Sequence, residues 1–92
     1  MNSAVALIMA RALIEADGPD TRKELAKLAQ AATADVADPR LACRLRAEFI
    51  DAMFCVALGA TLDLGPETMS RLRTRARDVV RIIQACRRCK RV

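Results

Sequence analysis

The chain contains no tryptophan, tyrosine or histidine, and its aromatic residues are two phenylalanines. Without histidine it lacks the side chain most often used as a general base and as a metal ligand. Three glycines among 92 residues provide no glycine-rich loop for a phosphate, and the only serines are Ser3 and Ser70. We therefore expect a protein that is not an enzyme and that carries no cofactor.

Four cysteines are the remaining candidates for chemistry: Cys43, Cys55, Cys86 and Cys89. The last two form a CxxC pair, but a redox CxxC normally begins a helix after a strand, whereas this one lies at the expected end of a helix. Cys43 and Cys55 are separated by roughly 18 Å along one expected helix, so they cannot easily complete a tetrahedral zinc site. We expect no metal and interpret Cys86 as the last residue of the apolar side of its helix.

Long hydrophobic runs are also missing. The longest run, at 4–10, is too short to cross a bilayer, has no basic segment before it and ends at Arg11. We therefore expect a cytoplasmic protein without a membrane span, in which the thiols stay reduced. Arginine accounts for thirteen of the sixteen basic residues, and alanine is abundant throughout the chain. We attribute both preferences to a GC-rich bacterial genome.

Helix-forming residues make up most of what is present. Hydrophobic residues form 53% of the chain, and no run alternates as a strand does. Turn and capping signals at 17–21, 38–40 and 65–66 divide the sequence. We expect one all-α domain covering 1–92, with a long hairpin made by its last two helices and a basic tail at 87–92. The four expected helices lie at about 3–17, 21–36, 39–60 and 66–88.

Two of these helices have more apolar surface than a small bundle can easily cover. Arg11 and Glu15 form the one narrow polar stripe of helix 3–17, and the segment 52–60 carries no charge. A helix that is apolar nearly all round is normally buried, and four helices cannot easily surround two of their own number. We therefore expect a homodimer. The apolar residues expected at this interface, or at an interface with another protein, are Leu7, Met9, Leu13, Ile14, Phe54 and Leu58.

Positive charge is concentrated at the end of the chain. Residues 66–92 hold nine basic and two acidic residues, whereas residues 1–65 hold seven basic and nine acidic ones. A row of arginines is expected on the side of helix 66–88 opposite its apolar residues: Arg73, Arg77, Arg81 and Arg88. Such a row can follow a nucleic-acid backbone, dock an acidic protein or simply be solvated. No aromatic residue lies among these arginines to stack on bases.

The segment 21–40 raises the question of DNA binding. It resembles the helix-turn-helix of lac-repressor-type regulators at Thr21, Glu24, Leu25, Ala26, Ala29 and Val36. This resemblance implies a second helix that lies in the major groove. At the turn, where that family usually has glycine, this chain has Gln30, and Pro39 limits the second helix. We interpret 21–36 instead as a capped amphipathic helix and its turn.

Two functional hypotheses follow. The first is a regulator or adaptor that binds an acidic or apolar surface of a partner protein through its apolar helix surfaces and its basic last helix. The alternative is a DNA-binding transcriptional regulator with a degenerate helix-turn-helix at 21–36 and an arginine-rich last helix that contacts phosphates. The two hypotheses differ in what the arginines contact: a partner protein in the first and DNA phosphates in the second.

Overall fold

The computed structural model describes residues 1–88, except for the side chain of Arg88. Within this range the chain forms four α-helices and no strand, which confirms the all-α prediction. None of the described helices combines the length and hydropathy that a membrane crossing needs. Cys89 and the rest of the expected tail after Arg88 lie outside the described residues. The helices are α1 (Ser3–Glu15), α2 (Arg22–Ala32), α3 (Pro39–Thr61) and α4 (Pro66–Arg88).

Helices α2 and α3 begin at the residues that the capping pattern indicates. The Thr21 hydroxyl accepts a hydrogen bond from the backbone N–H of Glu24 at 3.1 Å. The Asp38 carboxylate accepts one from the backbone N–H of Arg40 at 2.9 Å, and Pro39 occupies the first helical position. Each cap satisfies a backbone donor that has no partner within its helix.

Helices α1 and α3 end in the same way. The residue that follows each C-cap is left-handed, with φ of 66° at Asp17 and 55° at Asp63. The next backbone N–H then turns back onto the last helical turn, from Gly18 to the Leu13 carbonyl at 2.6 Å and from Leu64 to the Gly59 carbonyl at 3.0 Å. This arrangement is the Schellman motif, which ends a helix by satisfying its free carbonyls.

Helix α2 is shorter than expected, because it ends at Ala32 and residues 33–35 form a turn. The buried Thr33 hydroxyl donates to the Ala29 carbonyl at 2.9 Å, a local bond that competes with continued helix. Residues 21–36 therefore contain one helix and a turn. The second helix that the resemblance to a helix-turn-helix implies does not form within this segment.

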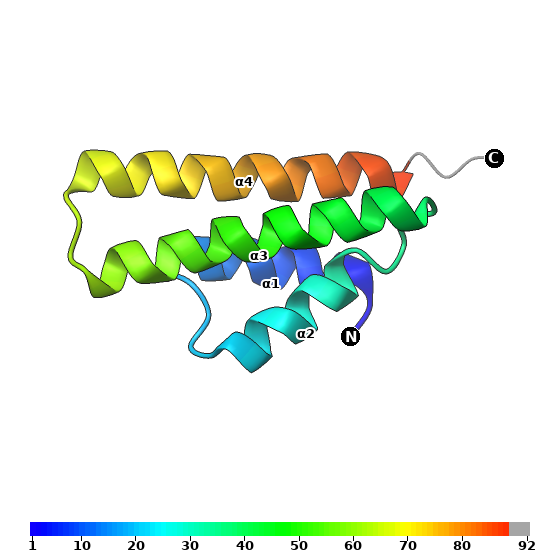
Figure 1. Ribbon diagram of the computed structural model, residues 1–92, viewed down its shortest axis with the longest axis horizontal. Helices are drawn as coiled ribbons and strands as arrows, with labels where there is room; N and C mark the ends of the chain where they lie inside the picture. The colour runs from blue at the N-terminus through cyan, green and yellow to red at the C-terminus, as the bar shows by residue number, and fades with distance from the viewer. Residues whose placement is uncertain (89–92) are drawn as a thin grey trace.

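The four helices form an up-and-down bundle (Figure 1). Each helix packs on its neighbours in sequence, and α1 also packs on α4, which closes the ring. The expected long hairpin is present, because α3 and α4 have 23 residues each and lie side by side. Helix α2 is the short member and crosses the bundle obliquely (Figure 1).

One core fills the centre of the bundle. Small side chains such as Ala6, Ala10 and Ala29 are completely buried, and they allow the helices to approach closely. The larger fully buried hydrophobic side chains are Leu7, Ile14, Phe49, Met53, Val56, Val80 and Ile83.

The structure places Leu7 and Ile14 in this core rather than at a surface that a partner can reach. Their relative exposures are 1% and 0%, because they lie with Ala10 on the one side of α1 that faces the other helices. On the opposite side, Ile8 is 63% exposed and Met9 is 43% exposed. A single chain therefore buries more of α1 than its sequence led us to expect, and one apolar side of the helix is left uncovered.

Candidate functional site

The arginines of α4 that face α1 are held in ion pairs. Arg73 Nη2 lies 2.7 Å from the Asp17 carboxylate. Arg77 donates to one Glu15 oxygen through both Nε and Nη2, at 2.9 and 2.7 Å. These pairs join the last helix to the end of the first, so part of the arginine row acts within the chain.

The rest of the row is not a line of unpaired charges either. Arg81 lies 3.0 Å from the Asp78 carboxylate one turn away on the same helix. Arg88 is the last residue of α4, and its side chain is outside the described part of the structure. Three of the four predicted arginines therefore have a carboxylate from their own chain.

On its other side, α4 pairs with α3 through Arg75. Its guanidinium lies 2.6 Å from Asp51 and 3.4 Å from Glu48, and Nη1 lies 3.9 Å from the Cys55 sulfur. The hydrogen bond to Asp51 raises the pKa of Arg75 above its ordinary value, with a partial offset from burial. Arg75 therefore stays charged at any working pH and forms ion pairs with both α3 carboxylates, the closer one with Asp51.

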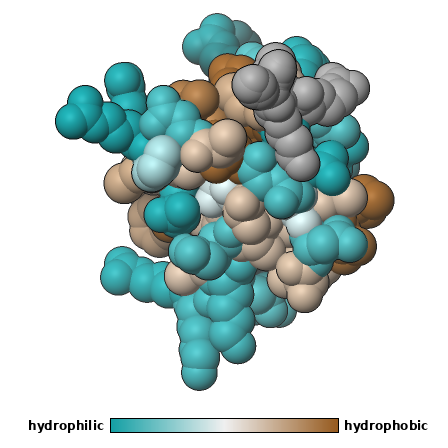
Figure 2. Space-filling model, turned by 90° about the vertical axis from the view of Figure 1, so that its right-hand side faces the viewer, coloured by the Kyte–Doolittle hydropathy of each residue, from teal (hydrophilic) through white to brown (hydrophobic). Residues whose placement is uncertain are grey.

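The basic residues of α2 and of the first turns of α3 differ from those of α4. Within the described part of the chain they form no ion pair, and the nearby carboxylates of Glu24 and Asp38 accept backbone hydrogen bonds at helix starts. Figure 2 shows the end of the bundle at which α3 begins, where hydrophilic side chains project from much of the surface between hydrophobic patches. The exposed basic residues without an ion pair on these two helices are Arg22, Lys23, Lys27, Arg40 and Arg44.

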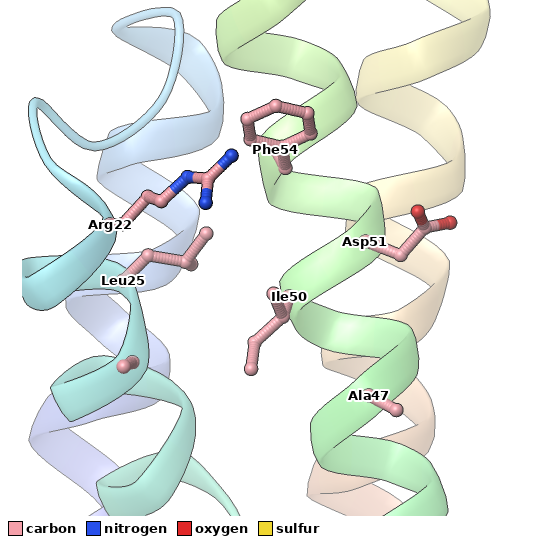
Figure 3. A pocket seen from close by; sticks show the side chains of 7 residues that line it. Arg22, Leu25, Ala47, Ile50, Asp51 and Phe54 are labelled. Carbon is pink, nitrogen blue, oxygen red and sulfur yellow. The ribbon is translucent and has the colours of Figure 1, made fainter.

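An open groove of about 340 Å³ lies between α2 and α3. Its lining is mainly apolar, and Figure 3 shows Leu25 of α2 and Ile50 of α3 pointing into the space between the helices. The Asp51 side chain points away from α2, toward α4, where Arg75 binds it. The groove therefore presents a hydrophobic floor without an available carboxylate.

Phe54 is the most exposed large hydrophobic residue of the groove wall. Its ring is 38% exposed, and the Arg22 guanidinium carbon lies 5.8 Å from the ring centroid, as in a cation–π contact (Figure 3). A smaller hollow of about 130 Å³ continues beyond this pair toward Pro19 and Ala57. Arg22 and Phe54 thus stand between two adjoining hollows.

The four predicted apolar residues that are not in the core lie on two separate surfaces. Phe54 and Leu58 are exposed on α3, whereas Met9 is exposed and Leu13 is half-buried on α1. Helices α1 and α3 are not neighbours in the ring, so the structure does not bring the two sets together. Our reading of the sequence also missed Arg22 as a member of this site.

The three cysteines that the structure describes do not gather into a site. Cys43 is exposed, and Cys55 and Cys86 are half-buried free thiols. Among the described residues, no three acidic or cysteine side chains come together in a way that could hold a metal ion. The groove between α2 and α3 is therefore the stronger candidate for function.

In comparisons with protein-family models, curated proteins and solved structures, nothing matches this chain. The functional argument therefore depends on the geometry of the groove and on the distribution of charge around it.

Proposed function

We propose that this chain is a non-enzymatic adaptor or regulator that binds a partner protein in the groove between α2 and α3. The observation that carries the proposal is Phe54, an aromatic side chain left 38% exposed beside an apolar groove and covered by Arg22. Aromatic residues and arginine dominate the binding energy of protein interfaces, above all around a pocket that a partner can desolvate.

The groove is a better docking surface than the arginine row of α4. A partner that used Arg73 or Arg77 would have to replace the carboxylates of Asp17 and Glu15, which those arginines already contact at 2.7 Å. A partner that contacts Arg22 and Phe54 breaks no ion pair of the described residues. The acidic docking surface that we expected to meet α4 is thus better placed near α2 and α3.

Binding also fits this site better than catalysis. The polar side chains of the groove lining are Arg22 and Asp51, and Asp51 is bound to Arg75. Arginine stays protonated, so it is a poor general base. This composition supports recognition of an apolar side chain.

We further propose that the protein is a cytoplasmic homodimer, with the uncovered side of α1 as its interface. Val5, Ile8 and Met9 are 45%, 63% and 43% exposed and lie on the same side of that helix. A second copy of the same side would remove this apolar surface from water. Sedimentation equilibrium tests the proposal: the dimer is expected at micromolar concentration, and Ile8→Glu should yield a monomer. A wild-type monomer at tens of micromolar would contradict it.

The proposed groove can be tested by site-specific photocrosslinking in the source cell. A photoreactive phenylalanine analogue at Phe54 should form a discrete protein adduct, because this ring is expected to lie against the partner. The same analogue at Ile82, which is 51% exposed on α4, is the matched control. Identical adduct patterns at the two positions would contradict a partner site in the groove.

DNA binding is the competing proposal, because exposed basic residues on α2 and α3 have no carboxylate partner among the described residues. It predicts affinity for a mixed-sequence duplex that falls steeply between about 50 and 200 mM salt. Fluorescence anisotropy of a labelled duplex measures this directly. Absence of duplex binding at the lower salt concentration, together with a Phe54-specific protein adduct, would favour the adaptor.

A further inference from the structure

The outward side of α3 is divided along its length into a basic part and an apolar part. Arg40, Arg44, Ala47, Phe54 and Leu58 follow steps of three, four or seven residues, so they lie on one side of the helix. All five are exposed. A partner lying along this side therefore meets positive charge at one end and hydrophobic side chains at the other.

Helix α2 supplies a second basic edge. Arg22 lines the groove, and Lys23 follows it on the same helix, both exposed and without an ion pair in the described structure. Lys27 lies on the other side of α2 from Leu25 and lines a different hollow. Asp51 could have balanced this charge from α3, but Arg75 of α4 binds its carboxylate at 2.6 Å. Asp20 lines the smaller hollow, but the basic residues of α2 and of the first turns of α3 outnumber the carboxylates around the groove.

The shape of the site suits a helix. Two helices form its walls, and the small side chains of Ala26 and Ala47 leave space between them. Hollows of about 340 and 130 Å³ lie on either side of Arg22 and Phe54. Apolar side chains that repeat every three or four residues along a bound helix can enter two adjoining hollows, as in other helix-in-groove complexes.

We infer that the occupant of the groove is an acidic amphipathic helix of a partner protein, an inference that rests on the proposed function. Its apolar side lies over Leu25, Ile50 and Phe54, and its carboxylates meet the basic residues of α2 and of the first turns of α3. Complementary charge of this kind sets the orientation of the helix and speeds its association. A nucleic acid would meet the same charges but would gain nothing from the apolar floor of the groove.

A displayed library of helical peptides tests the inference with the full chain. The library places apolar residues at i, i+4, i+7 and i+11 and allows Glu, Lys or Gln at every other position. Selection should enrich peptides that are rich in Glu, and their affinity should fall as salt is added. Phe54→Ser should weaken binding about tenfold or more, as loss of an interface anchor does. Leu58→Ser provides a second variant on the same side of α3.

Separate variants measure how much the basic residues beside the groove contribute to binding. Arg22→Gln and Arg44→Gln should each weaken the selected peptides about twofold to fivefold, the range for an exposed ion pair. The controls lie on α4, where Ile82→Ser and Arg71→Gln change exposed side chains away from the groove and should leave affinity unchanged. Circular dichroism confirms that every variant keeps its helical content.

The outcomes separate this inference from the proposed function. Enriched peptides that are neutral or basic but still depend on Phe54 would overturn the acidic partner and leave the groove as the binding site. Peptides that tolerate both Phe54→Ser and Leu58→Ser, or a selection that enriches nothing, would overturn both proposals. Displacement of the peptide by a DNA duplex at low salt, with a steep salt dependence, would identify phosphate as the ligand and overturn the acidic helix.

Discussion

The two sides of the bundle use arginine in opposite ways. Where α1 meets α4, Arg11 donates to Gln84 at 2.7 Å and Arg77 donates to Glu15 at the same distance. Where α2 meets α3, Arg22 lies over an aromatic ring and has no carboxylate partner in the described structure. We call the first region the α1/α4 seam and the second the α2/α3 groove.

The difference shows that the density of charge along a sequence does not locate a binding surface. The segment with the largest excess of basic residues satisfies most of its described arginines internally, with carboxylates that lie far away in the sequence, such as Glu15 for Arg77. The segment with net negative charge contributes the basic residues that remain available. Exposed ion pairs add little stability, so the seam is expected to be held mainly by its apolar core.

The largest contrast between the two regions should appear when a hydrophobic side chain is truncated. Ile83 is completely buried, so Ile83→Ala is expected to lower the free energy of unfolding by about 2 to 5 kcal/mol. Leu58→Ala removes the same number of carbon atoms from a side chain that is 43% exposed, and its cost is expected to be about 1 kcal/mol or less. Urea denaturation of both variants measures the difference. Equal costs would mean that the outward side of α3 is packed as tightly as the core.

The loop that connects the two regions gives the next largest effect. Gly18 has a φ of 94°, and a Cβ there would lie 2.9 Å from the Cβ of Ala57 in α3. Gly18→Ala is therefore expected to cost about 1 to 3 kcal/mol. Gly65→Ala is the matched control, because nothing lies within 4 Å of its added Cβ. Thermal denaturation should show a lower Tm for the first variant alone, and an unchanged Tm would show that the loop does not pack on α3.

Much of the fold could be predicted from short-range signals. Thr21, Asp38 and Pro39 act within one turn of the helices they begin, so the sequence placed the starts of α2 and α3 correctly. The end of α2 was predicted at residue 36, because the apolar spacing continues to Val36 while the chain turns after Ala32. Val36 is buried all the same, so the spacing reflected burial and not helix.

The candidate site could be predicted only in part. The sequence indicated Phe54 and Leu58 as apolar surface residues, and both are exposed. The contact of Arg22 with Phe54 depends on how α2 crosses α3, and the pairing of Arg77 with Glu15 joins residues 62 positions apart. A helical wheel treats each helix alone, so it cannot show which charges are neutralised by another helix.

Charge reversal sharpens the comparison at a smaller energy. Arg77→Glu places two carboxylates together at the α1/α4 seam, so the free energy of unfolding should fall by about 1 kcal/mol, and added salt should reduce the loss. Arg44→Glu, on the basic part of α3, should change stability by no more than about 0.5 kcal/mol. Urea denaturation at low and high salt measures both variants. Equal effects would show that the Arg77 pair does not persist in solution.

The smallest expected effect concerns Arg22, whose described cation–π contact is with the exposed ring of Phe54. Arg22→Gln should lower stability by about 0.5 to 1 kcal/mol at most, because a cation–π contact at an exposed site is weak. NMR gives a more sensitive measurement, since Phe49 and Phe54 are the only aromatic residues and their ring resonances are easily told apart. The Phe54 ring signals should shift in the variant, while those of Phe49, which is 1% exposed, should not. Unchanged Phe54 signals would show that the guanidinium does not cover the ring in solution, and the groove would then present a bare aromatic surface to its partner.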